Sequence, residues 1–266
     1  KTERFYAWMK RKPSLMPNNW LPRFGIVTTL NLRPELSPKS ERGKMTSKNP
    51  STIAILGGTG KEGKGLAYRW AIAGHKVIIG SRTPEKAISA VEEVTKLAGK
   101  RVLVSGMENA EAARKADVVV LTVPFSYHVD MLQFIKAHVQ GKIFIDVTVP
   151  LVPPKVTRVH MPPEGSAAQQ AQAILGENVK VFAAFQNISY ENLLSGEPVD
   201  CDVLVTGGDK ETRGMVIDLV HDTGLVGIDA GPIENSVVVE GLTSILIGIN
   251  KQFGVHSSGI RITGIQ

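Results

Sequence analysis

The sequence predicts an α/β protein with a doubly wound parallel sheet and a second, smaller C-terminal α+β domain. Three observations support this prediction. A short apolar run at residues 53–56 breaks into glycines and then continues as a helical pattern. Strand-like and helix-like segments alternate after it, as parallel strands with right-handed crossovers require. From Ile188 onward the pattern changes to a smaller unit. The architecture is of the Rossmann type.

The individual elements follow from local patterns in chain order. Thr83 as N-cap and Pro84 in the first turn predict the start of a helix that reaches about Leu97. Residues 147–165 contain five prolines and predict a long connection, which in compact domains is often functional. The expected strands are 53–56, 76–79, 102–104, 117–124, 142–146, 180–185 and 203–206, and the later helices are 109–115, 127–138, 166–175, 211–223 and 235–253.

The glycines after the first strand have the spacing G-x-G-x-x-G. Gly58 would allow the tight turn, Gly60 would leave room for a diphosphate, and Gly63 would let the helix approach the strand. The first turn of that helix offers unpaired N–H groups, so the backbone would bind the diphosphate. The motif predicts a dinucleotide site.

The end of the second strand indicates which dinucleotide binds. Sites that prefer NAD usually place Asp or Glu there to bind the ribose hydroxyls, whereas this chain has Ser81 and Arg82, followed by Lys86. A guanidinium binds a 2′-phosphate through paired charge-assisted hydrogen bonds. The alternative is that both cations are solvated charges at a helix start, but cations oppose the macrodipole there. These residues therefore favour NADP.

The end of the fourth strand, Thr122-Val123-Pro124, lies at the carboxyl edge where open α/β sheets bind ligands, so its backbone could line the nicotinamide. The alternative is a proline that only ends a strand. His128 follows in a helical stretch, and as a lone histidine we expect it to be structural.

The distribution of charge along the chain limits the partners that we expect. Residues 1–50 contain 11 Lys or Arg against 3 Asp or Glu, whereas the remainder contains 20 against 22. With no stacking platform or reader motif, we expect no nucleic-acid partner. The first 50 residues predict a flexible extension, either a transit peptide or a segment ahead of a start at Met45.

The cysteine and histidine patterns exclude several site classes. The single Cys201 has no disulfide or C-x-x-C partner, and the histidines show no paired metal spacing, so no metal is expected. A G-x-S-x-G elbow and a P-loop are both missing from the sequence, which argues against hydrolases and kinases. No apolar stretch is long enough to span a bilayer, so we expect a cytoplasmic protein without a membrane partner.

Four segments together resemble a known family: Ile-Leu-Gly-Gly-Thr-Gly-x-x-Gly-Lys-Gly-Leu-Ala (55–67), Gly-Ser-Arg (80–82), Leu-Thr-Val-Pro (121–124) and Asp-Ala-Gly-Pro-Ile-Glu-Asn-Ser (229–236). Gly207-Gly-Asp209 and Glu240-Gly-Leu-Thr243 extend the similarity. The chain resembles the F420-dependent NADP oxidoreductases, which move a hydride between NADP(H) and a deazaflavin. The resemblance runs from about residue 52 to residue 264. This chain differs from the family at Lys61-Glu62, where the family often has a neutral pair of residues.

The resemblance implies a set of site residues on both parts of the chain. For NADP these are Gly58, Thr59, Gly60, Lys61, Glu62, Gly63, Ser81, Arg82, Lys86, Thr122, Val123 and Pro124. For the deazaflavin coenzyme F420 they are Phe185, Gln186, Asn187, Ile188, Ser236, Leu242 and Thr243. Pro124 and Asn187 are the candidates for positioning the rings. Direct hydride transfer needs little side-chain acid–base help, which fits the absence of an obvious catalytic dyad in the sequence.

The expected organisation is a basic extension (1–50), an NADP-binding Rossmann domain (51–187) and a small C-terminal domain (188–266) that closes the cleft. The last helix is apolar at Val237, Val238, Leu242, Ile245, Leu246 and Ile249, which is more than a small domain buries. We therefore expect a homodimer. Two functional alternatives remain open: an NADPH-dependent reductase of another acceptor, such as an imine, a flavin or a metal chelate, and a non-catalytic NADP-binding sensor.

Overall fold

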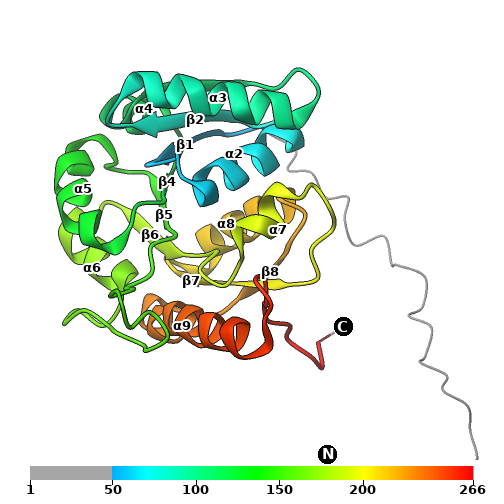
Figure 1. Cartoon of the computed structure of the whole chain (residues 1–266). Coiled ribbons are helices and arrows are strands. Elements are labelled where there is room, and N and C mark those ends of the chain that lie inside the picture. The colour runs from blue at the N-terminus through cyan, green and yellow to red at the C-terminus, as the bar shows by residue number, and fades with distance from the viewer. Residues whose placement is uncertain (1–49, 266) are drawn as a thin grey trace, which may run out of the picture. The chain divides into compact units, whose positions relative to one another are not determined.

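The computed structural model describes residues 50–265, which belong to one compact unit. The extension expected at residues 1–50 lies outside the described residues, apart from Pro50. In the described part, eight strands form one sheet in the order β3-β2-β1-β4-β5-β6-β7-β8 (Figure 1). The strands are β1 (Thr52–Leu56), β2 (Lys76–Ser81), β3 (Val104–Glu108), β4 (Val118–Leu121), β5 (Ile143–Asp146), β6 (Lys180–Ala183), β7 (Asp202–Gly207) and β8 (Val226–Asp229).

The first six strands are parallel, and β1 pairs with β2 on one side and with β4 on the other. Strand β7 runs antiparallel to β6, and β8 runs parallel to β7. The order of the first six strands, 3-2-1-4-5-6, is that of the Rossmann fold. The predicted α/β class is therefore confirmed. In this fold the ligand crevice opens where the strand order reverses, which here is between β1 and β4.

Helices cover both faces of the sheet (Figure 1). They are α2 (Lys61–Ala73), α3 (Pro84–Ala98), α4 (Asn109–Lys115), α5 (His128–Ile135), α6 (Ala167–Leu175), α7 (Tyr190–Leu194), α8 (Lys210–Asp222) and α9 (Ser236–Phe253), with 3-10 turns at Phe125–Tyr127, Lys136–His138 and Ile233–Asn235. One buried cluster joins α2, α3, α7 and α8 to the sheet, and another joins α4, α5 and α6. Within residues 50–265, no helix has the length and apolar character needed to cross a membrane.

The apolar run of β1 explains why the sheet can be covered on both faces. Residues 53–56 are fully buried, as expected for a parallel strand with helices above and below it. Trp70 of α2 is also fully buried, and its indole N–H donates to the carbonyl of Leu219 in α8 at 2.8 Å. A Cβ on Gly65 would lie 2.7 Å from Leu193 Cβ, so this glycine allows α7 to pack closely on α2.

The boundary expected near residue 188 does not separate two sheets. Strands β7 and β8 continue the edge of the sheet that begins with the Rossmann strands. The antiparallel pairing of Phe182 with Gly207 and of Ala183 with Thr206 makes this connection. Residues 188–266 therefore extend the first part of the chain in one sheet, and their role in closing the cleft stays a prediction.

Several predicted boundaries are corrected by the structure. The third strand is Val104–Glu108 and not 102–104, and its pairing with β2 is concealed in the sequence by the turn-like pair Ser105-Gly106. Gly106 is needed because a Cβ there would lie 2.8 Å from the Ala87 carbonyl carbon of α3. Helix α7 was not predicted, because five residues show no helical period. Thr83 precedes α3 as expected, but its side chain makes no capping hydrogen bond.

Candidate functional site

The glycine loop lies directly after β1, at the edge where the crevice opens. A Cβ on Gly58 would lie 2.6 Å from the Ile55 carbonyl oxygen, and one on Gly63 would lie 2.5 Å from Gly58 Cα. Both glycines are therefore required by the packing of the loop itself. The left-handed residue of the turn is Gly57, with a φ of 68°, which the motif did not single out.

Gly60 differs from its neighbours because the space beside it is open. A Cβ there would meet nothing closer than the Gly57 carbonyl oxygen at 4.0 Å. Its φ of −73° and ψ of 168° are accessible to any residue. Since neither packing nor backbone strain explains this glycine, the space is suited to a group that approaches the backbone. It immediately precedes the first turn of α2, where unpaired N–H groups favour an anion.

Asn109, the first residue of α4, is a site residue that sequence reasoning missed. It is buried, and its Oδ1 accepts a hydrogen bond from the Gly57 N–H at 3.2 Å. A Cβ on Gly80 would lie 2.8 Å from that same oxygen. The Asn109 Nδ2 atom is buried without a hydrogen-bond partner. A buried polar residue directly after a strand was the only available signal, and it is a weak one.

The residues after β2 include two exposed cations and a buried serine. Arg82 and Lys86 are exposed, and the Arg82 guanidinium carbon lies 5.3 Å from the centroid of the Tyr127 ring. Tyr127 belongs to the turn that follows β4, so this contact spans the crevice above β1. Ser81 is buried, and its hydroxyl accepts from the Thr83 N–H at 3.2 Å.

The pair Lys61-Glu62 begins α2, and its two side chains have different surroundings. The Lys61 ammonium lies 3.2 Å from the Tyr190 hydroxyl and 4.6 Å from the centroid of that ring, so it contacts α7. Glu62 is half-buried, and its Oε1 is buried without a hydrogen-bond partner. Burial raises the pKa of Glu62 to about 8. This carboxyl is therefore mostly protonated at neutral pH.

The segment after β4 packs against the glycine loop. The Thr122 hydroxyl donates to the Leu56 carbonyl at 3.0 Å. Val123 Cγ1 would lie 2.6 Å from a Cβ on Gly57, so the left-handed glycine also makes room for this side chain. Pro124 then begins the turn that leads into α5. The structure thus brings together the loop after β1 and the segment after β4, as predicted.

The segment after β6 lies at the same edge of the sheet. Phe185 has a φ of 75°, which is uncommon for a residue with a side chain. The Gln186 amide nitrogen donates to the Asp146 carbonyl at 2.7 Å, and the Asn187 amide nitrogen donates to the Asp202 carbonyl at 2.6 Å. The remaining amide oxygens, Gln186 Oε1 and Asn187 Oδ1, are buried without partners.

The structure places Phe185, Ile188 and Ser236, three of the deazaflavin candidates, in the protein core; Ile188 is 7% exposed and belongs to the same buried cluster as Phe185. The Phe185 ring is buried and packs edge-on against Trp70, with the ring centroids 5.6 Å apart. Ser236 is fully buried, and its hydroxyl lies 2.6 Å from the Thr206 hydroxyl. Neither the Phe185 nor the Ser236 side chain therefore presents a surface to a ligand. Leu242 and Thr243 of α9 are half-buried, and the Thr243 hydroxyl donates to the Gln186 carbonyl at 2.7 Å.

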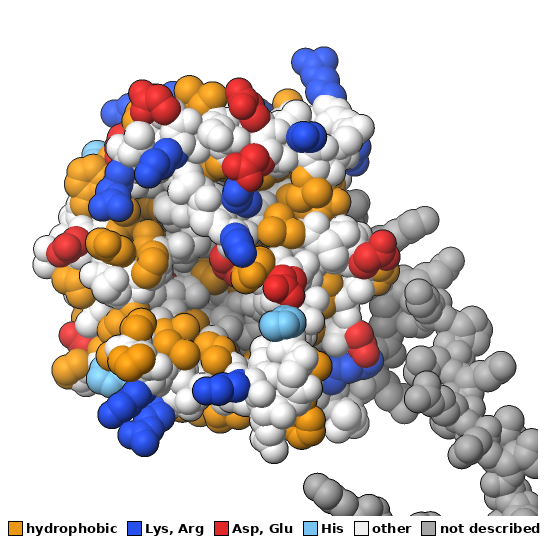
Figure 2. Space-filling model, in the orientation of Figure 1, with side chains coloured by type: hydrophobic (Ala, Val, Ile, Leu, Met, Phe, Trp, Pro, Cys, Tyr) orange, Lys and Arg blue, Asp and Glu red, His pale blue; other side chains and the backbone are white. Residues whose placement is uncertain are grey.

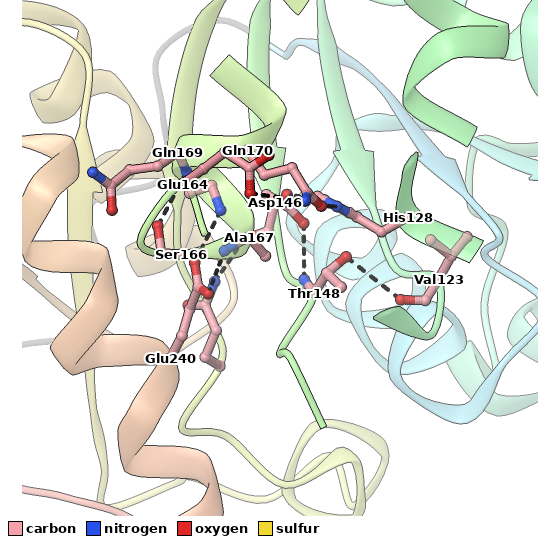
Figure 3. Close-up of polar contacts among 12 residues, drawn as sticks. Val123, His128, Asp146, Thr148, Glu164, Ser166, Ala167, Gln169, Gln170 and Glu240 are labelled. Carbon is pink, nitrogen blue, oxygen red and sulfur yellow. Dashed lines mark hydrogen bonds and ion pairs between the residues drawn. The ribbon is translucent and has the colours of Figure 1, made fainter. Parts of the chain in front are cut away.

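A buried polar network lies behind this edge (Figure 3). His128 and Asp146 are fully buried, with His128 Nε2 2.7 Å from Asp146 Oδ2. Burial lowers the pKa of His128, but the Asp146 carboxylate and the Gln170 oxygen outweigh it, so the pKa is raised. Glu240 of α9 accepts from the Ala167 N–H of α6 at 2.7 Å, and burial raises the pKa of Glu240 to about 8.

Comparisons with known proteins agree with this geometry. Residues 52–150 match the family described as "NADP oxidoreductase coenzyme F420-dependent". The F420-dependent NADP reductase of Methanocaldococcus jannaschii is 42% identical over 222 residues, covering 80% of this chain and 99% of the relative. The enzyme of the same name from Methanothermobacter thermautotrophicus is 42% identical over 220 residues, covering 80% and 95%.

Among solved structures, a crystal structure of a protein assigned as an F420-dependent NADP reductase from Arthrobacter sp. FB24 has the same fold. Its TM-score is 0.69 at 23% identity, and the match covers 79% of this chain and 98% of that one. The curated relatives are similar over nearly their whole length. The chain therefore belongs to the F420-dependent NADP oxidoreductase family.

Proposed function

We propose that this protein transfers a hydride directly between NADP(H) and the deazaflavin coenzyme F420, in the crevice above β1 and β4. NADP would lie along the loop after β1, with its phosphates at Gly60 and the first turn of α2. The deazaflavin would lie against Gln186 and Asn187 and against Leu242 and Thr243 of α9. The family membership supports this activity.

One observation on the described residues supports the placement of the ligands at this edge of the sheet. Four buried side-chain polar atoms between residues 50 and 265 lack a hydrogen-bond partner: one is in the first turn of α2 after β1, one directly follows β3, and two follow β6, all on the side of the carboxyl edge. They are Glu62 Oε1, Asn109 Nδ2, Gln186 Oε1 and Asn187 Oδ1. An unpaired buried polar atom costs about 1–3 kcal/mol. Their gathering at one edge is expected where a ligand supplies the missing partners.

The surface has the form that such a site needs. Figure 2 shows a hollow between the part formed by the first helices and the part formed by α9, with basic side chains on its upper rim. Arg82 and Lys86 follow β2 and are exposed, so they can bind the 2′-phosphate that distinguishes NADP from NAD. Ser81 adds a hydroxyl beside them.

The protein's contribution to the reaction is orientation and exclusion of water. A bound nicotinamide would supply a hydride from its C4 to C5 of the deazaflavin, and a ring nitrogen of the deazaflavin would take up the balancing proton from solvent outside the contact between the two rings. Pro124 and Val123 would support the nicotinamide ring, and Asn187 would position the deazaflavin. Two rings held face to face at about 3–3.5 Å need no side-chain nucleophile.

A direct assay tests the proposal. Purified protein, NADPH and oxidised F420 are mixed, and the deazaflavin absorbance is followed with time. We expect it to bleach at a rate proportional to protein concentration. Tight NADPH binding without bleaching would contradict the proposal. In that case imines, flavins and metal chelates are offered as acceptors: turnover with one of them identifies a different reductase, and NADPH binding without any turnover identifies a sensor.

We also propose that two copies of the chain associate through α9. Val238, Ile245 and Phe253 are 63%, 51% and 69% exposed. With Ile249 they recur at helical spacing along one face. Figure 2 shows hydrophobic side chains gathered where α9 and the neighbouring loop lie in Figure 1. Sedimentation should give twice the mass of the chain, and Ile245→Glu should give the single mass. A monomeric parent protein would contradict the proposal.

A further inference from the structure

Asp146, the last residue of β5, is linked to both segments that are proposed to hold the reacting rings: its backbone carbonyl binds Gln186 directly, and its carboxylate reaches Val123 through Thr148. Its Oδ1 accepts from the Thr148 N–H at 2.9 Å, and its backbone carbonyl accepts from the Gln186 amide nitrogen at 2.7 Å. The residue is fully buried, and Figure 3 shows its carboxylate beside His128 and Thr148. Because β5 lies between β4 and β6, Asp146 sits between the segment that would hold the nicotinamide and the one that would hold the deazaflavin.

On the nicotinamide side, the connection continues through Thr148. The hydroxyl of this buried residue donates to the Val123 carbonyl at 3.4 Å. Val123 in turn packs against Gly57, at the place that a side chain on this glycine would occupy. The Asp146 carboxylate therefore fixes Thr148, which fixes the segment after β4 against the glycine loop.

On the deazaflavin side, the connection continues through Gln186. Its amide nitrogen is held by the Asp146 carbonyl, and its own carbonyl accepts from the Thr243 hydroxyl of α9 at 2.7 Å. The Gln186 Oε1 atom is left buried without a partner. Because the side-chain nitrogen is fixed, the orientation of this free oxygen is fixed as well.

The hydrogen-bond partners of His128 determine the charge state of the His128–Asp146 pair. Gln170 Nε2 donates to Glu164 at 3.1 Å, so its Oε1 faces His128 Nδ1 at 2.9 Å and can only accept. The Asp146 carboxylate also only accepts. Both imidazole nitrogens therefore donate, and the pair is an imidazolium and a carboxylate. A buried ion pair of this kind orients its members more than it stabilises the fold.

We propose that Asp146 is a positioning residue for hydride transfer, which sets the position of Val123 relative to Gln186 and with it the separation of the two rings. The inference rests on the proposed placement of NADP and F420. A misplacement of about 1 Å costs on the order of 100-fold in rate. Loss of the Asp146 carboxylate, which would release Thr148 and through it Val123, therefore has a large effect on the chemical step. Its effect on NADPH affinity is small, because the glycine loop and Arg82 bind the phosphates.

The test compares Asp146→Ala with Asp146→Asn in single-turnover reduction of F420 by NADPH. Asp146→Ala removes the anchor of Thr148, and we expect hydride transfer to slow by roughly 10- to 100-fold, with the Kd for NADPH changed less than about threefold. NADPH carrying deuterium at C4 should show the full primary isotope effect on turnover, since the hydride step becomes rate-limiting. Asp200→Ala, at an exposed position, is the matched control.

Asp146→Asn should restore most of the rate. The new amide oxygen can still accept from Thr148, and the new amide nitrogen can donate to a neutral His128 that keeps its proton on Nδ1. A folded Asp146→Ala variant with the parent single-turnover rate would overturn the proposal, and so would equal losses of rate and NADPH affinity.

If Asp146→Ala does not fold, the Thr148→Val variant tests the positioning proposal instead. It removes the hydroxyl bond to Val123, so hydride transfer should slow by about threefold or more at unchanged NADPH affinity, and an unchanged rate would refute the proposal. A parent protein that binds NADPH but does not reduce F420 would refute the proposed function instead, so the two failures are distinguishable.

Discussion

Replacing Gly60 with alanine should weaken NADPH binding without destabilising the fold. An ideal Cβ at this position meets no atom closer than 4.0 Å, and its φ of −73° suits alanine. The methyl group would instead occupy space proposed for the diphosphate. Displacing one charge-assisted phosphate bond costs about 1.5–3 kcal/mol. The Kd for NADPH should therefore rise by about 10- to 150-fold.

Two other glycines provide controls for this prediction. Gly63→Ala places a Cβ 2.5 Å from Gly58 Cα, where only backbone could move, so it should cost roughly 1–3 kcal/mol of stability. Gly214→Ala in α8 meets nothing within 4 Å and should stabilise by roughly 0.5–1 kcal/mol. Calorimetric titration with NADPH and thermal unfolding separate the effects. Parent affinity in Gly60→Ala would refute the argument that a ligand occupies this space.

Three further predictions concern charged residues. Arg82→Ala should weaken NADPH by roughly 1.5–3 kcal/mol more than NADH; equal losses in titrations with both cofactors would show that Arg82 does not bind the 2′-phosphate. Because the pKa of Glu62 is about 8, its carboxylate forms above that pH and should repel the diphosphate. The Kd for NADPH should therefore rise between pH 8 and 9 in the parent protein but not in the Glu62→Gln variant. Glu240 has a folded pKa of about 8 against 4.5 unfolded, so its contribution to stability is complete below pH 4.5 and is lost as the pH rises through 8. Urea unfolding at pH 5, 7 and 9 should show a smaller decline for Glu240→Gln than for the parent, and parallel curves would contradict this.

Family membership does not specify which side chains contact the ligands. The structure reduces the number of candidates. Of the residues implied for the deazaflavin, Gln186 and Asn187 each keep a buried oxygen without a partner, whereas Phe185 and Ser236 are enclosed in the core. Lys61 contacts Tyr190 of α7, so in the proposed site the backbone and Arg82 would bind the phosphates. These distinctions depend on where side chains point, which residue type and spacing do not specify.

The sequence by itself determined the fold class, the glycine loop and the preference for NADP. These depend on local features: an apolar run, glycines at fixed spacing, and Ser81-Arg82 at a strand end. Tertiary structure alone decided that β7 and β8 extend the same sheet, that Asn109 supports the glycine loop, and that Asp146 binds Gln186 directly and reaches Val123 through Thr148. The Asn109–Gly57 and Gln186–Asp146 contacts join residues that are 52 and 40 positions apart. No local pattern encodes them, because they form only when the carboxyl ends of neighbouring strands meet.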